Sequence, residues 1–147
     1  MKSSIKALFS TDILSKRAHI TFLVYRILLA FAIIRVHGYK KLVHFEAEVL
    51  HIPDPFGFGG QAAVVMAILS NVVCAVLVAL GLLTRLAALG ALIVPLTGLL
   101  IVHLNDPWIQ KDAPLMYSLA FSLILFIGPG KYSLDRLIYQ RVLGTST

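Results

Sequence analysis

The chain has 147 residues, of which 59% are hydrophobic and only 14% are charged. A soluble domain carries about 25% charged residues, so this composition excludes an ordinary soluble protein and indicates an all-α membrane protein. The net charge of +6 comes from basic residues scattered near the ends of apolar segments, which argues against a nucleic-acid-binding face. We expect one integral membrane domain over residues 1–147, with the lipid bilayer as its first partner.

The first apolar segment runs from about Ala18 to Val36 and predicts a membrane-spanning helix. As a helix it measures about 28 Å, close to the hydrocarbon thickness of a bilayer. Arg26 lies inside it, where an arginine costs about 2.5–3.5 kcal/mol on insertion scales. Either this side chain snorkels to the inner head groups, or it faces the bundle interior and holds a polar partner or an anion. His37 lies three turns further on and shares a face with Arg26.

The connection after this segment predicts an amphipathic helix lying at the outer membrane surface. Over residues 37–52 the apolar positions recur with helical spacing, and prolines follow. His44, Glu48 and His51 share another face, where spacings of four and three residues make them candidate ligands for zinc or iron. Helical surfaces carry such a pattern by chance, so a solvated polar face is the alternative.

Three more apolar segments predict three further spans. They are Gln61–Leu83, Leu86–Val102 and Ala113–Ile127. The short turn Gly81–Arg85 makes the second and third spans antiparallel neighbours, and Pro95 should kink the third. Asp112 is the candidate N-cap of the fourth span, with Pro114 in its first turn. The predicted fold is a four-helix transmembrane bundle with an additional interfacial amphipathic helix between spans one and two.

A stripe of small residues crosses the second span. It consists of Ala63, Ala67, Asn71, Ala75 and Ala79 and allows two helix backbones to approach closely. Asn71 lies near the middle of this span, so we expect it to contact Arg26 or to share a ligand with it. No carboxylate lies inside a predicted span, so Arg26 has an acidic partner only if Asp135 or Asp12 folds back toward it.

The distribution of basic residues predicts the orientation of the chain in the membrane. With both termini inside, the inner side holds Lys2, Lys6, Lys16, Arg17, Arg85, Lys131, Arg136 and Arg141, and the outer side holds Arg35, Lys40, Lys41 and Lys111. The positive-inside rule then favours cytoplasmic termini, a basic leader over Met1–Arg17, and four spans in a bacterial inner membrane.

Several short motifs together resemble the DoxX family of small bacterial membrane proteins. They are Arg26, His37-Gly-x-x-Lys41, Gly81-Leu-Leu-Thr-Arg85 and Gly128-Pro-Gly-Lys-Tyr-Ser-Leu-Asp135. The resemblance implies a four-helix membrane bundle, and the family takes its name from the membrane part of a thiosulfate:quinone oxidoreductase. Members often carry Glu where this chain has Asn71, which removes a candidate proton carrier. Asp112 falls where members often place an acidic residue.

These observations lead to two functional hypotheses. In the first, the chain is a subunit or accessory of a membrane redox system, with an intrabundle pocket for a quinone-like molecule or a lipid. The candidate pocket residues are Arg26, His37, Lys41, Asn71 and His103. In the second, it is a non-catalytic module that binds and stabilises a partner membrane protein. The expected partners are a redox subunit and further copies of the chain.

The sequence contains no self-contained catalytic motif. It has no phosphate-binding glycine loop, nucleophile elbow, zinc-protease motif, or haem or iron–sulfur ligand pattern. The single Cys74 excludes thiol-relay chemistry by this chain alone. We therefore expect any electron-carrying cofactor to belong to a partner.

Overall fold

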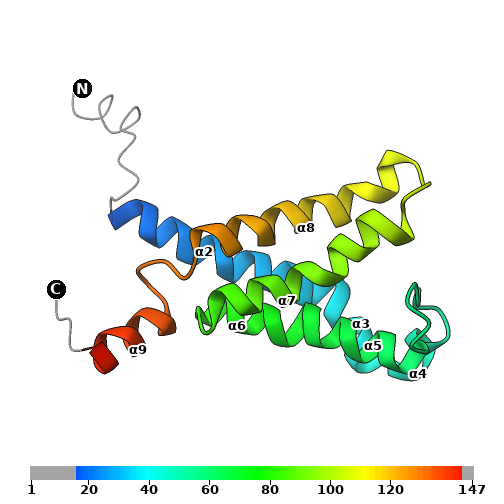
Figure 1. The fold of residues 1–147 in the computed structure, drawn as a ribbon, viewed down its shortest axis with the longest axis horizontal. Coiled ribbons are helices and arrows are strands. Elements are labelled where there is room, and N and C mark those ends of the chain that lie inside the picture. Colours follow the sequence, from blue (N-terminus) through cyan, green and yellow to red (C-terminus); the bar gives the residue numbers. More distant parts are fainter. Residues whose placement is uncertain (1–15, 144–147) are drawn as a thin grey trace.

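The computed structural model describes residues 16–143, where every regular element is a helix. This confirms the all-α prediction; the predicted leader, Met1–Arg17, lies almost wholly outside the described residues. Long helical rods run side by side along the longest axis of the molecule (Figure 1). Three of them are long and apolar enough to cross a membrane, namely Lys16–Val43, Gly60–Leu80 and Thr84–Val102.

The first rod is longer than the sequence predicted. It joins α2 (Lys16–Ile33), the π-helical segment η1 (Ile34–Gly38) and α3 (Tyr39–Val43), and it ends where His44 leaves the helical region at φ −120°, ψ 44°. The prediction of one separate amphipathic helix over residues 37–52 is therefore wrong. Its first part continues the first rod, and only the short α4 (Phe45–Val49) stands apart.

The second rod joins α5 (Gly60–Ile68), the π-helical η2 (Leu69–Cys74) and α6 (Ala75–Leu80). It ends three residues earlier than predicted because Gly81 adopts φ 69°, a left-handed conformation that favours glycine and terminates helices. The small-residue stripe faces the inside of the molecule, since its central members Ala67, Asn71 and Ala75 are all buried.

The remaining rods are α7 (Thr84–Thr97) with the π-helical η3 (Gly98–Val102), and α8 (Trp108–Ile127). As predicted, Pro95 lies inside α7. The fourth rod starts five residues earlier than predicted because the chain turns into the helix at Pro107 (φ −58°, ψ 152°). Asp112 is therefore in the second turn and not the N-cap. Its neighbours Gln110 and Lys111 are further polar residues in these first turns, and α8 is not among the three helices that are long and apolar enough to cross a membrane.

The core lies where the four rods meet. It combines small residues of α7 with larger side chains from the other rods, among them Ile33, Val78 and Phe121. The alanines of α7 let the neighbouring helices approach closely, and Phe121 and Ile124 of α8 fill the space opposite. A hydrogen bond from the Tyr25 hydroxyl to the Ala120 carbonyl (3.3 Å) ties the first rod to the fourth.

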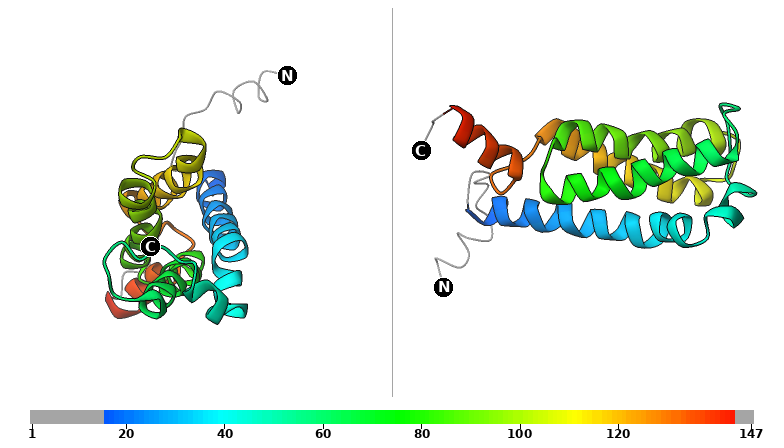
Figure 2. Two further views of the ribbon diagram at one scale, coloured as in Figure 1. Left: turned by 90° about the vertical axis from the view of Figure 1, so that its right-hand side faces the viewer. Right: turned by 90° about the horizontal axis from the view of Figure 1, so that it is seen from below.

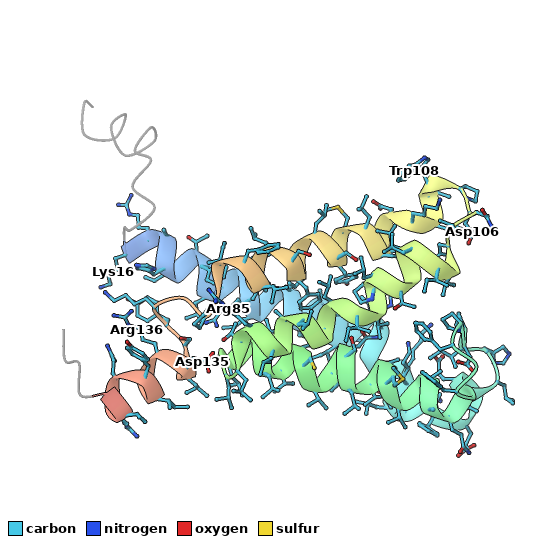
Figure 3. The ribbon with its side chains drawn as sticks, viewed as in Figure 1. Lys16, Arg85, Asp106, Trp108, Asp135 and Arg136 are labelled. Atoms are coloured by element: carbon cyan, nitrogen blue, oxygen red, sulfur yellow. The ribbon has the colours of Figure 1, made fainter. Side chains whose placement is uncertain are left out.

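The two ends of the bundle differ in what they carry. The start of α2 and the tail helix α9 (Leu134–Leu143) lie at one end, which we call the terminal end (Figures 1 and 2). The loop end, opposite, carries residues 44–59 and the 103–107 turn. Figure 3 shows Arg85, Asp135 and Arg136 at the terminal end and Asp106 and Trp108 at the loop end. The chain therefore enters and leaves the bundle at the same end.

Gly38 marks a close crossing of the first and second rods. A Cβ added there would lie 2.6 Å from Val72 Cγ2 and 3.4 Å from the Asn71 carbonyl oxygen. We expect Gly38→Ala to destabilise the protein by about 1–3 kcal/mol through overpacking, measured as a lower midpoint of thermal unfolding in detergent. Adding Val72→Ala should restore part of this loss.

Gly98→Ala is the matched control, because its added methyl would meet nothing closer than Pro114 Cβ at 3.8 Å. Equal destabilisation by Gly38→Ala and Gly98→Ala would contradict the close crossing.

Candidate functional site

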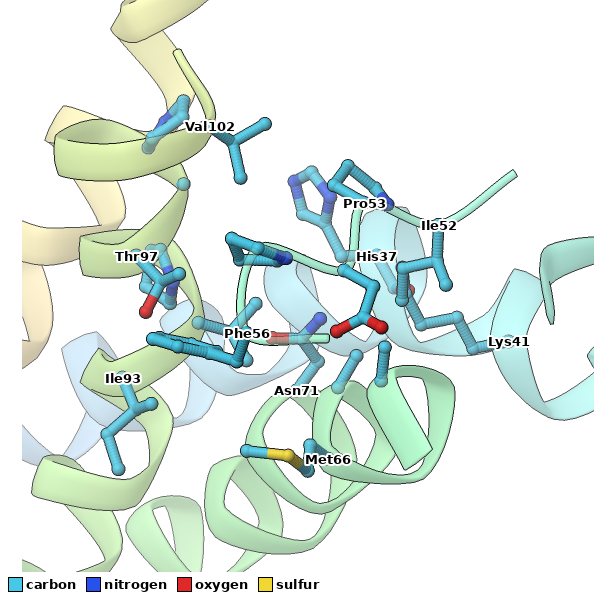
Figure 4. Close-up of a pocket in the computed structure, with 18 of the residues that line it drawn as sticks. His37, Lys41, Ile52, Pro53, Phe56, Met66, Asn71, Ile93, Thr97 and Val102 are labelled. Atoms are coloured by element: carbon cyan, nitrogen blue, oxygen red, sulfur yellow. The ribbon is translucent and has the colours of Figure 1, made fainter. Parts of the chain in front are cut away.

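A cavity of about 300 Å³ lies between the rods toward the loop end. Its walls come from all four rods and from residues 44–59, the linker that joins the first rod to the second (Figure 4). Most of the lining is apolar, including Ile33, Met66 and Ile93, with a few polar side chains among them. A mainly apolar cavity with a small number of polar groups is the usual form of a small-molecule site.

Four of the five predicted pocket residues line this cavity. They are His37 and Lys41 of the first rod, Asn71 of the second rod, and His103 just after the third. The fifth, Arg26, does not line it. Three polar residues that sequence reasoning missed, Asp54, Thr97 and Tyr117, also belong to the lining.

Each π-helical segment within residues 16–143 contributes to the cavity. His37 belongs to η1, Asn71 to η2, and Gly98 and Val102 to η3. A π-helical turn contains an extra residue and shifts the faces of the helix on either side of it. In η2 this shift leaves Ser70 and Asn71 both buried, so Asn71 faces the cavity while Ser70 bonds to the Ala91 carbonyl on α7.

Asn71 has unused hydrogen-bonding capacity. The residue is only 3% exposed, yet its Oδ1 has no hydrogen-bond partner among the described residues. An unpaired buried acceptor costs about 1–3 kcal/mol, so a donor from a bound molecule would be favourable here. The His37 ring packs edge-on against the Tyr117 ring at 5.3 Å and forms the neighbouring wall.

The other two polar groups are already held in place by neighbours. Lys41 Nζ donates to the His37 carbonyl (3.0 Å) and lies 3.8 Å from a Glu48 carboxylate oxygen. The ring Nδ1 of His103 lies 2.8 Å from the Asp106 carboxylate. A carboxylate on one ring nitrogen fixes the orientation of a histidine, which leaves the other nitrogen for a different partner.

The candidate metal ligands do not assemble. Within residues 16–143, no group of three or more His, Cys, Asp or Glu side chains is placed to hold a metal ion. Glu48 is directed to Lys41, and the ring of His51 bonds to the carbonyl of Ala47, one turn back. His44 lies at the break between α3 and α4, so it does not share one continuous helical face with Glu48 and His51, as the metal hypothesis required.

A DoxX family model matches residues 21–104 of the chain. The chain belongs to the DoxX family. No curated protein and no solved structure matches it. The matched region runs from α2 to just beyond η3, so it includes every predicted pocket residue.

In this DoxX protein, Arg26 is part of a junction at the terminal end of the bundle. It is 1% exposed, which rules out snorkelling, and its Nη2 donates to the Tyr132 carbonyl at 2.5 Å. The Phe22 ring lies 5.6 Å from Cζ. A Cβ at Gly81 would collide with Nη1, so the guanidinium lies beside the end of α6.

This position separates Arg26 from Asn71. Asn71 lies ten residues before Gly81, or about 15 Å away along the second rod. The predicted contact between the two is therefore not formed. The first and second rods are staggered along the axis of the bundle. At the terminal end the first rod extends past the end of α6, so Arg26, ten residues after its start, is level with the turn at Gly81.

Asp135 folds back to the same junction, as the sequence allowed. Its carboxylate accepts hydrogen bonds from the Leu83 amide (2.7 Å), the Thr84 amide (2.8 Å) and the Thr84 hydroxyl (2.7 Å). These bonds cap the first turn of α7 from a distant part of the chain. Burial by itself raises the pKa of Asp135, but the bonds from Thr84 and Leu83 and the nearby charge of Arg26 lower it more, so its pKa lies below the ordinary value.

We expect Asp135→Ala to destabilise the DoxX chain by about 1–2 kcal/mol, because it removes the cap of α7. Since the pKa of the carboxyl is lower in the folded than in the unfolded chain, its contribution is complete above about pH 4 and is lost as the pH falls further. Thermal unfolding measured between pH 3 and pH 7 should show a steeper acid loss for the wild type than for Asp135→Ala.

Asp112→Ala, at an exposed carboxylate of α8, serves as the control and should leave the acid loss unchanged. Parallel pH profiles for the wild type and Asp135→Ala would contradict the role of this cap.

Proposed function

We propose that this DoxX protein is a subunit or accessory protein of a membrane redox system, and that its cavity binds a quinone-like molecule or a lipid. The observation that carries the proposal is the buried, unpartnered Oδ1 of Asn71 in a mainly apolar cavity. The amide of Asn71 can both donate and accept hydrogen bonds, as carbonyl and hydroxyl head groups require. His37 and His103 add polar groups to the same space.

The proposed arrangement in the membrane has four spans, with α8 as the fourth and the terminal end in the cytoplasm. The start of α2 and the tail helix α9 lie at the same end of the bundle, which supports an even number of crossings (Figure 1). The bacterial inner membrane follows from the same orientation, which the basic residues favour. The cavity then opens toward the outer half of the bilayer.

The redox role that we propose is one of binding and placement, not of electron carriage. Within the sequence there is no ligand pattern for haem or an iron–sulfur cluster, so a partner subunit would supply the electron-carrying group. The cavity residues would hold a lipophilic molecule where that partner can reach it. The alternative role, a module that stabilises a partner membrane protein, could not use the small-residue stripe as its docking surface, because the central members of the stripe are buried inside the chain.

The test is a binding titration in nanodiscs with a short-tailed benzoquinone and with phosphatidylglycerol as separate probes. For whichever probe binds the wild type, Asn71→Leu should weaken binding about 5- to 30-fold, because leucine cannot form a hydrogen bond with the head group. Arg26→Met should bind as the wild type does, because Arg26 lies outside the cavity.

Ser70→Ala is the matched control, since Ser70 is a buried polar neighbour on η2 that does not line the cavity. Loss of binding in Arg26→Met with no change in Asn71→Leu would place the site at the other end of the bundle. Absence of binding of either probe to the wild type would refute the proposed ligand classes.

A further inference from the structure

The cavity reaches the lipid-facing surface of the bundle between the second and third rods. Met66 of α5 and Ile93 of α7 both line the cavity, yet they are 40% and 49% exposed. Figure 1 shows α5 and α7 diverging toward the loop end, and Figure 4 shows Met66 and Ile93 along one edge of the cavity. Side chains that belong both to the lining and to the outer surface mark an opening.

This opening lies at the depth of the hydrocarbon. Met66 is six residues inside the loop end of α5, and Ile93 is nine residues before the end of η3. These positions are about 9 Å and 14 Å from the helix ends, whereas half of a bilayer core is about 15 Å. With the proposed orientation, the opening faces the acyl chains of the outer leaflet.

The route from the outer aqueous side is lined by the linker. Ile52, Pro53 and Phe56 of the linker line the cavity, and the Phe56 ring stacks on Phe58 at 5.8 Å. The Asp54 carboxylate fixes the turn by accepting hydrogen bonds from the amides of Phe58 (3.1 Å) and Gly59 (2.7 Å). By the same criterion the aqueous end is also open, because Phe56 and Phe58 line the cavity and are 51% and 65% exposed. The cavity therefore has one opening toward water at the linker and a second toward lipid, flanked by Met66 and Ile93.

The polar and apolar parts of the site are arranged for an amphiphile. Two polar residues of the lining, Asn71 and His37, belong to π-helical segments inside the rods, while the opening toward lipid is bounded by Met66 and Ile93. The charged Lys41 and Asp54 and the ring of His103 line the loop end of the cavity. A molecule with a hydrogen-bonding head and an apolar tail can satisfy both at once. A head group without a tail would leave the apolar edge unfilled.

From these observations we propose that the ligand is a tailed amphiphile that enters sideways from the outer leaflet, between α5 and α7. Its head group bonds to the Asn71 amide, and its tail remains in the bilayer, passing between Met66 and Ile93. This inference rests on the proposed function, because it concerns the same cavity. It adds the direction of entry and the requirement for a tail.

The experiment compares two probes of the same head group in nanodiscs. One is a benzoquinone with a long isoprenoid tail, dissolved in the bilayer, and the other is the tail-less benzoquinone ring, added from water. Ile93→Trp narrows the opening, and Leu89→Trp is its control. Leu89 lies one turn away on α7 and is similarly exposed (47%), but it does not line the cavity.

We expect Ile93→Trp to slow association of the tailed probe about tenfold, with association of the tail-less probe unchanged. Leu89→Trp should match the wild type for both probes. Ile93→Ala, which widens the opening, should speed entry of the tailed probe and keeps the test decisive if the tryptophan variant does not fold.

Two results would overturn the sideways entrance while leaving the proposed function in place. One is equal slowing of both probes by Ile93→Trp, and the other is no change in either probe with Ile93→Trp and Ile93→Ala. Failure of both probes to bind the wild type would instead refute the quinone-like ligand and the entrance together.

Discussion

The fold depends on the three hydrogen bonds that the Asp135 carboxylate accepts at the start of α7. They join the turn between the second and third rods to the segment that follows the fourth rod. The Asp135 amide adds a fourth hydrogen bond between the same two segments by donating to the Gly81 carbonyl at 2.9 Å. Arg26 joins the first rod to the same junction through the Tyr132 carbonyl. With the rods fixed at the terminal end, their opposite ends can diverge, and the cavity occupies the space between them.

The shape of that space follows from local backbone features rather than from large side chains. Each of the first three rods contains a π-helical segment near the cavity, and each segment turns a new face inward. Small residues elsewhere keep the helices close, so the cavity is confined to the loop end. The unpaired Oδ1 of Asn71 lowers the stability of the protein when the cavity is empty, and it offers a hydrogen-bond acceptor to a bound polar head group.

Much of this arrangement could be predicted from the sequence. Hydropathy predicted the first three spans to within three residues at five of their six ends, and the first rod runs seven residues further than predicted. On the predicted face of Arg26 and His37, Arg26 is buried as the helical period required, whereas His37 is half-buried. Four of the five candidate pocket residues line one cavity because polar residues are rare in membrane helices and tend to face inward. The start of α8 lies five residues before the predicted one because Asp112 with Pro114 imitates a helix start, whereas the actual N-cap, Pro107, makes no side-chain cap bond.

The remaining features depend on tertiary contacts that leave no periodic signal. The stagger between the first and second rods decides that Arg26 meets Tyr132 and not Asn71, and nothing in either segment alone fixes this stagger. The π-helical segments have no reliable sequence signature. The cap of α7 comes from Asp135, some fifty positions along the chain, where a local search for capping residues cannot find it.

Native mass spectrometry of the wild-type protein, extracted gently from membranes, tests the central claim most directly. As collision energy strips away bulk lipid, one tailed amphiphile per chain should remain bound and be identifiable by its mass. A bare chain at energies that only just remove bulk lipid, or a graded series of adducts with no favoured stoichiometry, would contradict a dedicated site in the cavity.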